Sequence, residues 1–124
     1  MVGVGETEVL RKLVAREPLF HRTEFGTTRA DLEAMTSPDY WEVGASGRVY
    51  DRAFVVDVLL ERYAAGEPDP WSTEGFACRP LGPDTFLLTY TLTQGARITR
   101  RATVWERTGS SWRALYHQGT VVTD

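Results

Sequence analysis

The segment Thr85-Phe86-Leu87-Leu88-Thr89-Tyr90-Thr91-Leu92-Thr93 carries the clearest structural pattern in this chain. Its side chains alternate: one face carries Phe86, Leu88, Tyr90 and Leu92, and the other carries threonines and a leucine. Successive side chains of a β-strand point to opposite faces of the sheet. An alternation this regular therefore predicts a strand with one face against a core.

Three further segments near this stretch have the composition of strands, namely Trp71–Arg79, Ile98–Arg107 and Trp112–Val122. Short turn segments separate these strands, at Pro80–Asp84, Gln94–Arg97 and Thr108–Ser111. Because turns this short join antiparallel neighbours, the second half of the chain is predicted to be an antiparallel meander.

The first half of the chain carries helix signals with two short strands between them. Apolar residues at helical spacing predict a helix over Glu6–Arg16. Thr28 followed by Asp31 indicates the start of a second, short helix. Asp51 can cap a third helix that runs from Arg52 to about Ala65. Short strands are expected between the second and third helices, at Asp39–Gly44 and Val49–Tyr50.

Helices followed by a mostly antiparallel sheet define an α+β protein, and 124 residues suffice for one domain over residues 1–124. Each helix has one apolar stripe, so the N-terminal helices are expected to pack on one face of the sheet. If the sheet is curved, the result is a cone with a pocket inside. The other face of the sheet would stay partly apolar, which predicts a homodimer formed through it.

Charge and composition exclude several classes of function. The formal net charge of −3 argues against nucleic acid or an anionic membrane surface as a partner. We find no apolar run long enough to span a membrane and no signal peptide, and the single Cys78 permits no intrachain disulfide. These features predict a cytoplasmic protein without a cofactor. No metal site is expected, because the two histidines are far apart in the sequence.

Two charged residues inside predicted strands are candidates for the pocket. Arg101 shares one face of its strand with two threonines and Trp105. If that face lines the pocket, Arg101 can bind an anionic ligand; otherwise it lies on an exposed sheet face or in the dimer interface. Glu42 is either a pocket carboxylate with a shifted pKa or a partner in a structural salt bridge, to Arg48 or Arg101.

Two histidines could supply acid or base chemistry. His117 lies near the end of the last predicted strand, and its neighbour Gln118 points to the opposite face, so only one of the two can line the pocket. A histidine there can act as a general base near neutral pH, or it can simply be hydrogen-bonded to the backbone. His21 lies near Glu24 in an irregular segment and is the second candidate. The candidate catalytic residues are thus Glu42, His117 and His21.

Aromatic rings make up 11% of the chain, and they either fill the core or form the walls of a cavity with few polar groups. The candidate ligand-binding residues are accordingly Glu42, Tyr90, Arg101, Trp105, Tyr116 and Gln118, with His117 as the alternative to Gln118. The ligand is expected to be a small apolar or anionic molecule.

The order of elements resembles the nuclear transport factor 2-like superfamily, also called the cystatin-like fold. Two patches resemble, within it, the domain-of-unknown-function 4440 group: Tyr40-Trp41-Glu42-Val43-Gly44-Ala45-Ser46-Gly47-Arg48-Val49-Tyr50-Asp51-Arg52, and Arg101-Ala102-Thr103-Val104-Trp105 followed by Trp112-Arg113-Ala114-Leu115-Tyr116-His117-Gln118-Gly119-Thr120. The resemblance implies a cone, a pocket and a homodimer across the open sheet face. It implies no substrate, because the superfamily includes enzymes, ligand-binding modules and adaptors.

Three functions remain open from the sequence. The first is a small-molecule-binding protein. The second is an isomerase, dehydratase or cyclase in which Glu42 or a histidine is the acid or base toward a hydrophobic carbonyl compound. The third is a protein interaction module that binds its partner through the open sheet face.

Overall fold

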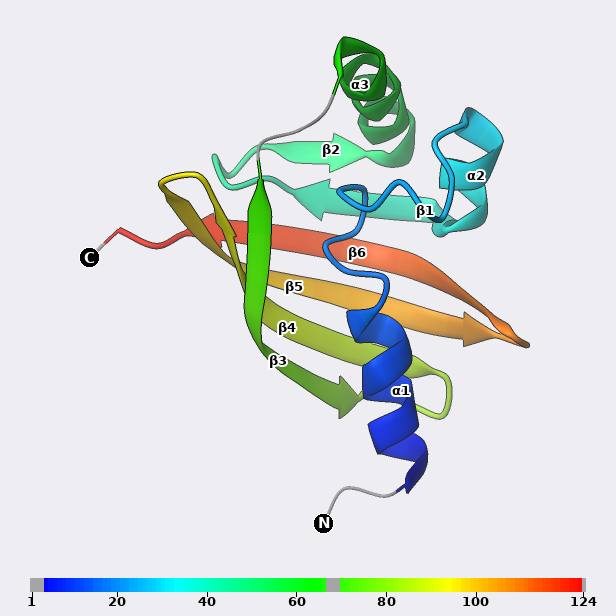
Figure 1. Ribbon diagram of the computed structural model, residues 1–124. Coiled ribbons are helices and arrows are strands. Elements are labelled where there is room, and N and C mark those ends of the chain that lie inside the picture. The colour runs from blue at the N-terminus through cyan, green and yellow to red at the C-terminus, as the bar shows by residue number, and fades with distance from the viewer. Residues whose placement is uncertain (1–3, 67–69, 124) are drawn as a thin grey trace.

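Six strands form one curved sheet in the order β2-β1-β6-β5-β4-β3. The computed structural model describes residues 4–66 and 70–123 of the chain (Figure 1). The strands are β1 (Thr36–Val43), β2 (Val49–Asp51), β3 (Trp71–Pro80), β4 (Thr85–Gln94), β5 (Arg97–Thr108) and β6 (Ser111–Val121). The predicted meander is confirmed, because β3 to β6 pair with their chain neighbours in antiparallel register.

Three helices complete the fold: α1 (Val4–Val14), α2 (Arg29–Ala34) and α3 (Arg52–Ala65). The predicted capping box is confirmed at α2, where Thr28 and Asp31 bond to each other's backbone N–H. Asp51 caps α3 as predicted, because its carboxylate accepts from the N–H of Phe54. The predicted end of α1 at Arg16 is two residues too late: the backbone there tightens, and Arg16 bonds back to the carbonyl of Leu13.

The pairing of β1 with β6 is parallel, and it is the one connection that the turns of the sequence do not indicate. It places β1, the first strand in the sequence, beside β6, the last, so that Glu42 is the direct partner of His117 in the pairing. The strand also begins earlier than predicted, at Thr36, although Pro38 lies within it. Pro38 is tolerated because the register shifts between Thr36 and Trp41, where a ladder hydrogen bond is not required.

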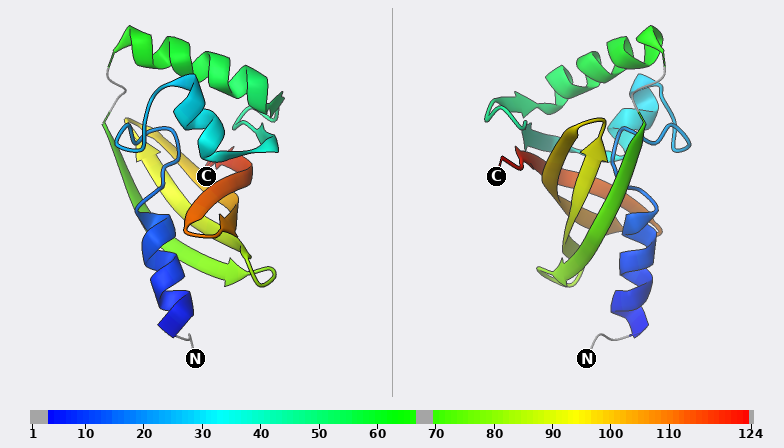
Figure 2. Two further views of the ribbon diagram at one scale, coloured as in Figure 1. Left: turned by 90° about the vertical axis from the view of Figure 1, so that its right-hand side faces the viewer. Right: turned by 60° about the vertical axis from the view of Figure 1, so that its left-hand side comes forward.

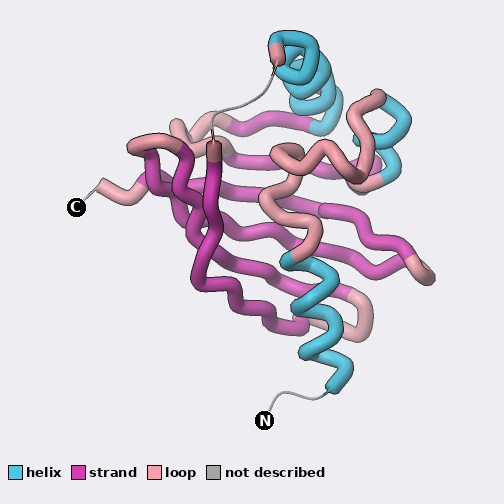
Figure 3. Tube along the Cα trace, in the orientation of Figure 1, coloured by secondary structure: helices cyan, strands magenta, loops and turns pink. Residues whose placement is uncertain are grey.

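The helices and the loop between α1 and α2 lie on the concave side of the sheet, and together they form the predicted cone (Figure 2, Figure 3). α1 packs against β3, α3 packs against β1 and β2, and α2 packs against β1 and α3. None of the described helices is long and apolar enough to cross a membrane. The outer face of the sheet carries no helix among the described residues.

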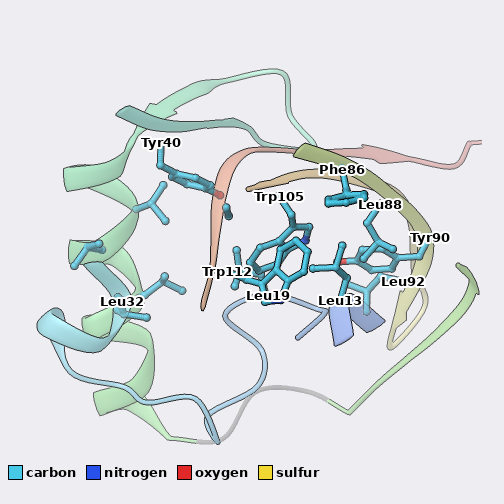
Figure 4. Packing of buried hydrophobic residues seen from close by; sticks show 14 of the residues in the cluster. Leu13, Leu19, Leu32, Tyr40, Phe86, Leu88, Tyr90, Leu92, Trp105 and Trp112 are labelled. Carbon is cyan, nitrogen blue, oxygen red and sulfur yellow. The ribbon is translucent and has the colours of Figure 1, made fainter. Parts of the chain in front are cut away.

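The hydrophobic core lies inside the cone, between the sheet and the helices (Figure 4). The predicted alternation in β4 is confirmed: Phe86, Leu88, Tyr90 and Leu92 are all buried. Leu13 of α1 and Leu19 of the loop after α1 lie on the same side of this cluster as the β4 residues, together with Trp105 of β5 and Trp112 of β6, whereas Leu32 of α2 lies at its other end (Figure 4). Removal of this apolar surface from water is the main stabilising term in a domain of this size.

Candidate functional site

A cavity of about 330 Å³ lies between α3, the loop after α1 and the concave face of the sheet. Its apolar wall comes mainly from α3 and the loop, and consists of Leu19, Phe20, Tyr50, Phe54, Val55, Val58 and Leu59. Its polar wall consists of His21, Glu42, Arg62, Arg101 and His117. A wider hollow of about 630 Å³ shares the polar wall and extends past Arg97 and Ser46. The site is therefore apolar along the helix and charged along the sheet.

Arg101 lies on the concave face of β5, which resolves the orientation that the sequence left open. Its Nε donates to Thr99 Oγ1 at 3.0 Å, and its Nη1 lies 3.3 Å from His117 Nε2. Among the described residues no carboxylate is within ion-pair distance of Arg101. A half-buried guanidinium that faces a cavity without a counter-ion is suited to an anionic group.

His117 is buried, and both of its ring nitrogens have partners. A guanidinium carries only donors, so His117 Nε2 must accept from Arg101. His117 Nδ1 then carries the proton and donates to Thr103 Oγ1 at 2.7 Å. Burial and the nearby Arg101 lower the pKa of His117 to about 3, which keeps the ring neutral. The sequence predicts His117 as a candidate general base. In the structure the lone pair of Nε2, which a general base would use to accept a proton, already accepts a hydrogen bond from Arg101.

Glu17 is a fully buried carboxylate that sequence reasoning missed. It follows α1 in the loop that enters the cone, and none of its surface is exposed. Its carboxylate accepts from Leu19 N at 2.6 Å, from the hydroxyl of Tyr90 at 2.6 Å and from Trp105 Nε1 at 3.3 Å. The hydroxyl of Thr103 is a fourth partner. Burial raises the pKa of Glu17, and these four hydrogen bonds offset part of the rise by favouring the charged form.

Glu42 lines the cavity from β1. The hydroxyl of Tyr40 donates to its Oε1 at 2.7 Å, and no ion pair joins Glu42 to Arg48 or Arg101 in the described part of the chain. The salt-bridge alternative is therefore not what the geometry shows. Burial raises the pKa of Glu42, although the hydrogen bond from Tyr40 and the charge of Arg101 act against the rise.

His21 contributes to the same wall from the loop after α1. Its Nδ1 lies 3.5 Å from the carbonyl oxygen of Leu19, and its ring also bonds to the side chain of Gln94. Burial and the charge of Arg101 lower the pKa of His21, so the ring is neutral near pH 7. The structure thus brings the three candidate acid and base residues, Glu42, His21 and His117, to one cavity.

The other predicted ligand-binding residues lie elsewhere. Tyr90 and Trp105 point into the cone, but they contact Glu17 and do not line the cavity. Tyr116 and Gln118 lie on the outer face of β6, so the expectation that they line the pocket is corrected: strand parity places His117 inside and its two neighbours outside. On that outer face the ring of Tyr116 packs against Trp41, with ring centroids 4.5 Å apart.

No three histidine, cysteine or carboxylate side chains in the described part of the chain gather where they could hold a metal ion. The chemistry of the cavity wall rests on its guanidinium groups, one carboxyl group and two neutral imidazoles. These groups can hold an anion and accept or donate a proton at Glu42, while the apolar side chains of α3 exclude water.

Solved structures with the same architecture come from several bacteria. An NTF2-like protein from Cytophaga hutchinsonii has a TM-score of 0.74 at 11% identity, with 94% of this chain and 98% of that chain covered. A cystatin-like protein from Caulobacter vibrioides has a TM-score of 0.72 at 16% identity, with 94% and 89% covered. A protein of unknown function from Pectobacterium atrosepticum, of the domain-of-unknown-function 3225 family, has a TM-score of 0.68 at 18% identity, with 94% and 92% covered.

These likenesses show that the chain has the NTF2-like, or cystatin-like, fold. At such low identity they show the fold alone. No family model matches the sequence, and no curated protein does. The resemblance to the domain-of-unknown-function 4440 group accordingly stays a prediction.

Proposed function

We propose that this protein binds a small amphipathic molecule, with an apolar body against α3 and an anionic group at Arg101. One observation carries the proposal: the guanidinium of Arg101 faces the cavity and has no carboxylate partner among the described residues. A partly desolvated charge is costly unless it is paired, and an anionic ligand would supply the pairing.

The cavity dimensions support a small ligand. A volume of about 330 Å³ lies at the lower end of the range for small-molecule sites, roughly 300–1,000 Å³. The apolar side chains of Val55, Leu59 and Phe20 line the cavity. A short alkyl or aromatic group that binds there is transferred out of water into an apolar environment, which is favourable. The apolar wall therefore favours the body of the ligand and the sheet wall favours its charged end.

The charges around the cavity favour an anion over a cation. Arg62 and Arg101 both line the cavity, and Arg97 lines the adjoining hollow. Glu42 is the one carboxyl group that the described residues place in this wall, and burial raises its pKa because it disfavours the charged form. The local field is positive even though the whole chain carries a formal charge of −3.

Titration with octanoate and octan-1-ol, followed by calorimetry, tests this proposal. The two probes share a hydrocarbon chain and differ in charge. Wild type should bind octanoate more tightly, and Arg101→Met should weaken octanoate binding about tenfold or more while octan-1-ol binding changes little. Arg100→Met is the matched control, because Arg100 is exposed on the other parity of β5. Equal affinity of the two probes for wild type would overturn the proposal.

A second function is supported by Glu42. A carboxyl group with a raised pKa, inside a cavity and hydrogen-bonded to Tyr40, is suited to general acid or base catalysis on a hydrophobic carbonyl compound. Glu42→Gln separates the two functions once a turnover assay exists. Loss of turnover with retained binding supports catalysis, and unchanged turnover excludes Glu42 as the acid or base.

A homodimer through the outer sheet face is proposed alongside the binding function. Support comes from Trp41, which is 45% exposed, and from its packing against Tyr116 on a face that no described helix covers. Large exposed aromatic side chains in contact with each other favour a partner surface. The isologous geometry of a twofold dimer would bring the same face of a second copy against them. If the protein is instead an interaction module, a different protein would bind to this outer sheet face.

A further inference from the structure

A chain of hydrogen bonds links the cavity to the interior of the cone. It begins at Arg101, passes through His117 and Thr103, and ends at Glu17. Glu17 itself does not line the cavity and has no exposed surface. The other three groups come from β5 and β6, whereas Glu17 comes from the loop after α1. The loop is thereby connected to the charged wall through side chains of the sheet.

The direction of this chain is determined at both ends. Arg101 can only donate, so His117 accepts at Nε2 and donates from Nδ1. The hydroxyl of Thr103 receives that proton and therefore has its own hydrogen available for Glu17. Glu17 accepts this hydrogen, as it accepts those of Leu19 N, the Tyr90 hydroxyl and Trp105 Nε1. Every link then points inward, and the remaining N–H groups of Arg101 are available to the cavity.

We infer that Glu17 is a positioning residue for ligand binding: through Thr103 it reinforces the Nδ1–H tautomer of His117 that Arg101 also favours, and so helps to hold Arg101 toward the ligand. The inference rests on the proposed function of Arg101. In the other tautomer His117 would present an N–H at Nε2 to an N–H of Arg101, and the two donors would repel each other. Arg101 would then leave its place, and its orientation toward the anionic group would be lost.

Glu17→Gln should reverse this order while nearly preserving the volume of the side chain. The backbone N–H of Leu19 and the indole of Trp105 are donors only, and the amide of the glutamine adds two more donors to the same small space. A hydroxyl must then turn from donor to acceptor. The hydroxyl of Thr103 can accept from the glutamine amide and donate its own hydrogen to His117 Nδ1 instead, which favours the Nε2–H tautomer.

Long-range ¹H–¹⁵N spectra of the imidazole rings test the inference in the free protein. Wild type should show His117 protonated at Nδ1, and Glu17→Gln should show it at Nε2 or as a mixture. Octanoate affinity should fall about tenfold in the variant, with octan-1-ol affinity unchanged. Tyr90→Phe is the matched control: it removes a hydrogen bond to Glu17 of 2.6 Å but leaves the chain through Thr103 intact, so the tautomer should not change.

Thr103 offers a second pair of variants if Glu17→Gln does not fold. Thr103→Val removes the acceptor of His117 Nδ1–H and should weaken the preference for that tautomer to a mixture, because Arg101 alone then favours it, whereas Thr103→Ser retains the hydroxyl and should restore the preference. An Nδ1–H ring in both Glu17→Gln and Thr103→Val would overturn the inference. The tautomer is measured in the free protein, so this result is distinct from a failure of the proposed function. The proposed function fails if wild type binds octanoate and octan-1-ol equally well.

Discussion

The guanidinium of Arg101 lies against the backbone of Gly119, where an added Cβ would be 3.6 Å from Arg101 Cζ. The two residues are direct partners across the β5–β6 pair. A glycine here leaves the space over the sheet that the guanidinium occupies beside His117. Gly119 belongs to the His117-Gln118-Gly119-Thr120 patch of the sequence, and this contact gives the glycine a physical role in the proposed site.

The contact predicts a graded response to substitution of Gly119. In Gly119→Ala the new methyl group makes ordinary van der Waals contact with Arg101, so octanoate affinity should stay within about twofold of wild type. Gly119→Leu places further carbon atoms where the guanidinium lies, and affinity should fall about tenfold or more. Calorimetric titration of both variants checks this. Equal octanoate affinities of Gly119→Ala and Gly119→Leu would show that Arg101 does not bind the ligand from its position beside Gly119.

The depressed pKa of His117 predicts a loss of stability in acid. In the unfolded chain the ring takes up a proton below about pH 6.5, whereas in the folded protein its pKa is about 3. Between these values the unfolded state binds the extra proton, so the free energy of unfolding falls as the pH falls from 6.5 toward 3. Well above this range the group contributes no pH dependence.

Urea unfolding of wild type and His117→Gln at several pH values measures this contribution. The variant lacks the titrating ring, so its stability should fall less steeply between pH 6.5 and 3, by up to about 1.4 kcal/mol per pH unit. Parallel curves for the two proteins across that range would contradict a neutral, buried His117.

The raised pKa of Glu42 predicts that anion binding weakens as the pH rises. Because the pKa of Glu42 is raised above the ordinary value of 4.5, the carboxyl group keeps its proton to a higher pH than an exposed glutamate does. When the pH exceeds this raised pKa, the carboxyl group loses its proton and adds a negative charge to the cavity. Octane-1-sulfonate is the suitable probe, because it stays ionised throughout. Its affinity should decline with rising pH in wild type and remain flat in Glu42→Gln.

Tyr40→Phe provides the matched variant for this titration. It removes the 2.7 Å hydrogen bond that favours the charged form of Glu42, so the decline should move to higher pH. A decline that persists unchanged in Glu42→Gln would assign the titration to another group.

The outer sheet face predicts a concentration-dependent dimer. Trp41→Arg introduces a charge beside Tyr116 and should shift sedimentation at micromolar concentration toward the monomer. Leu81→Arg is the control, because Leu81 is 58% exposed in the turn between β3 and β4. A wild-type protein that sediments as a monomer at these concentrations would contradict the proposed dimer.

Local patterns were sufficient to predict most of the fold. The alternation in β4 and the capping residues Thr28 and Asp51 act over a few positions, and the structure contains each as predicted. The parallel pairing of β1 with β6 joins residues far apart in the chain, as in the pairing of Glu42 with His117. No turn or periodicity encodes such a contact, so the sequence predicted the strand without its neighbour.

The site was predictable in its residue types and not in its geometry. Arg101 and Glu42 are recognisable as charges inside strands, but strand parity leaves each with two possible faces. Glu17 shows no signal at all: it follows a helix and precedes a proline, a position typical of an exposed loop residue. Its burial depends on Tyr90, Trp105 and Thr103, which are distant in the sequence and converge only in the folded cone.

Intermolecular NOEs between bound octanoate and the protein report the orientation of the ligand in the cavity. The protons next to the carboxylate should give NOEs to Arg101 and His117, and the terminal methyl group should give NOEs to Val55 and Leu59 of α3. The reverse orientation, or a ligand that contacts only the outer face of the sheet, would contradict the assignment of Arg101 as the anion-binding group.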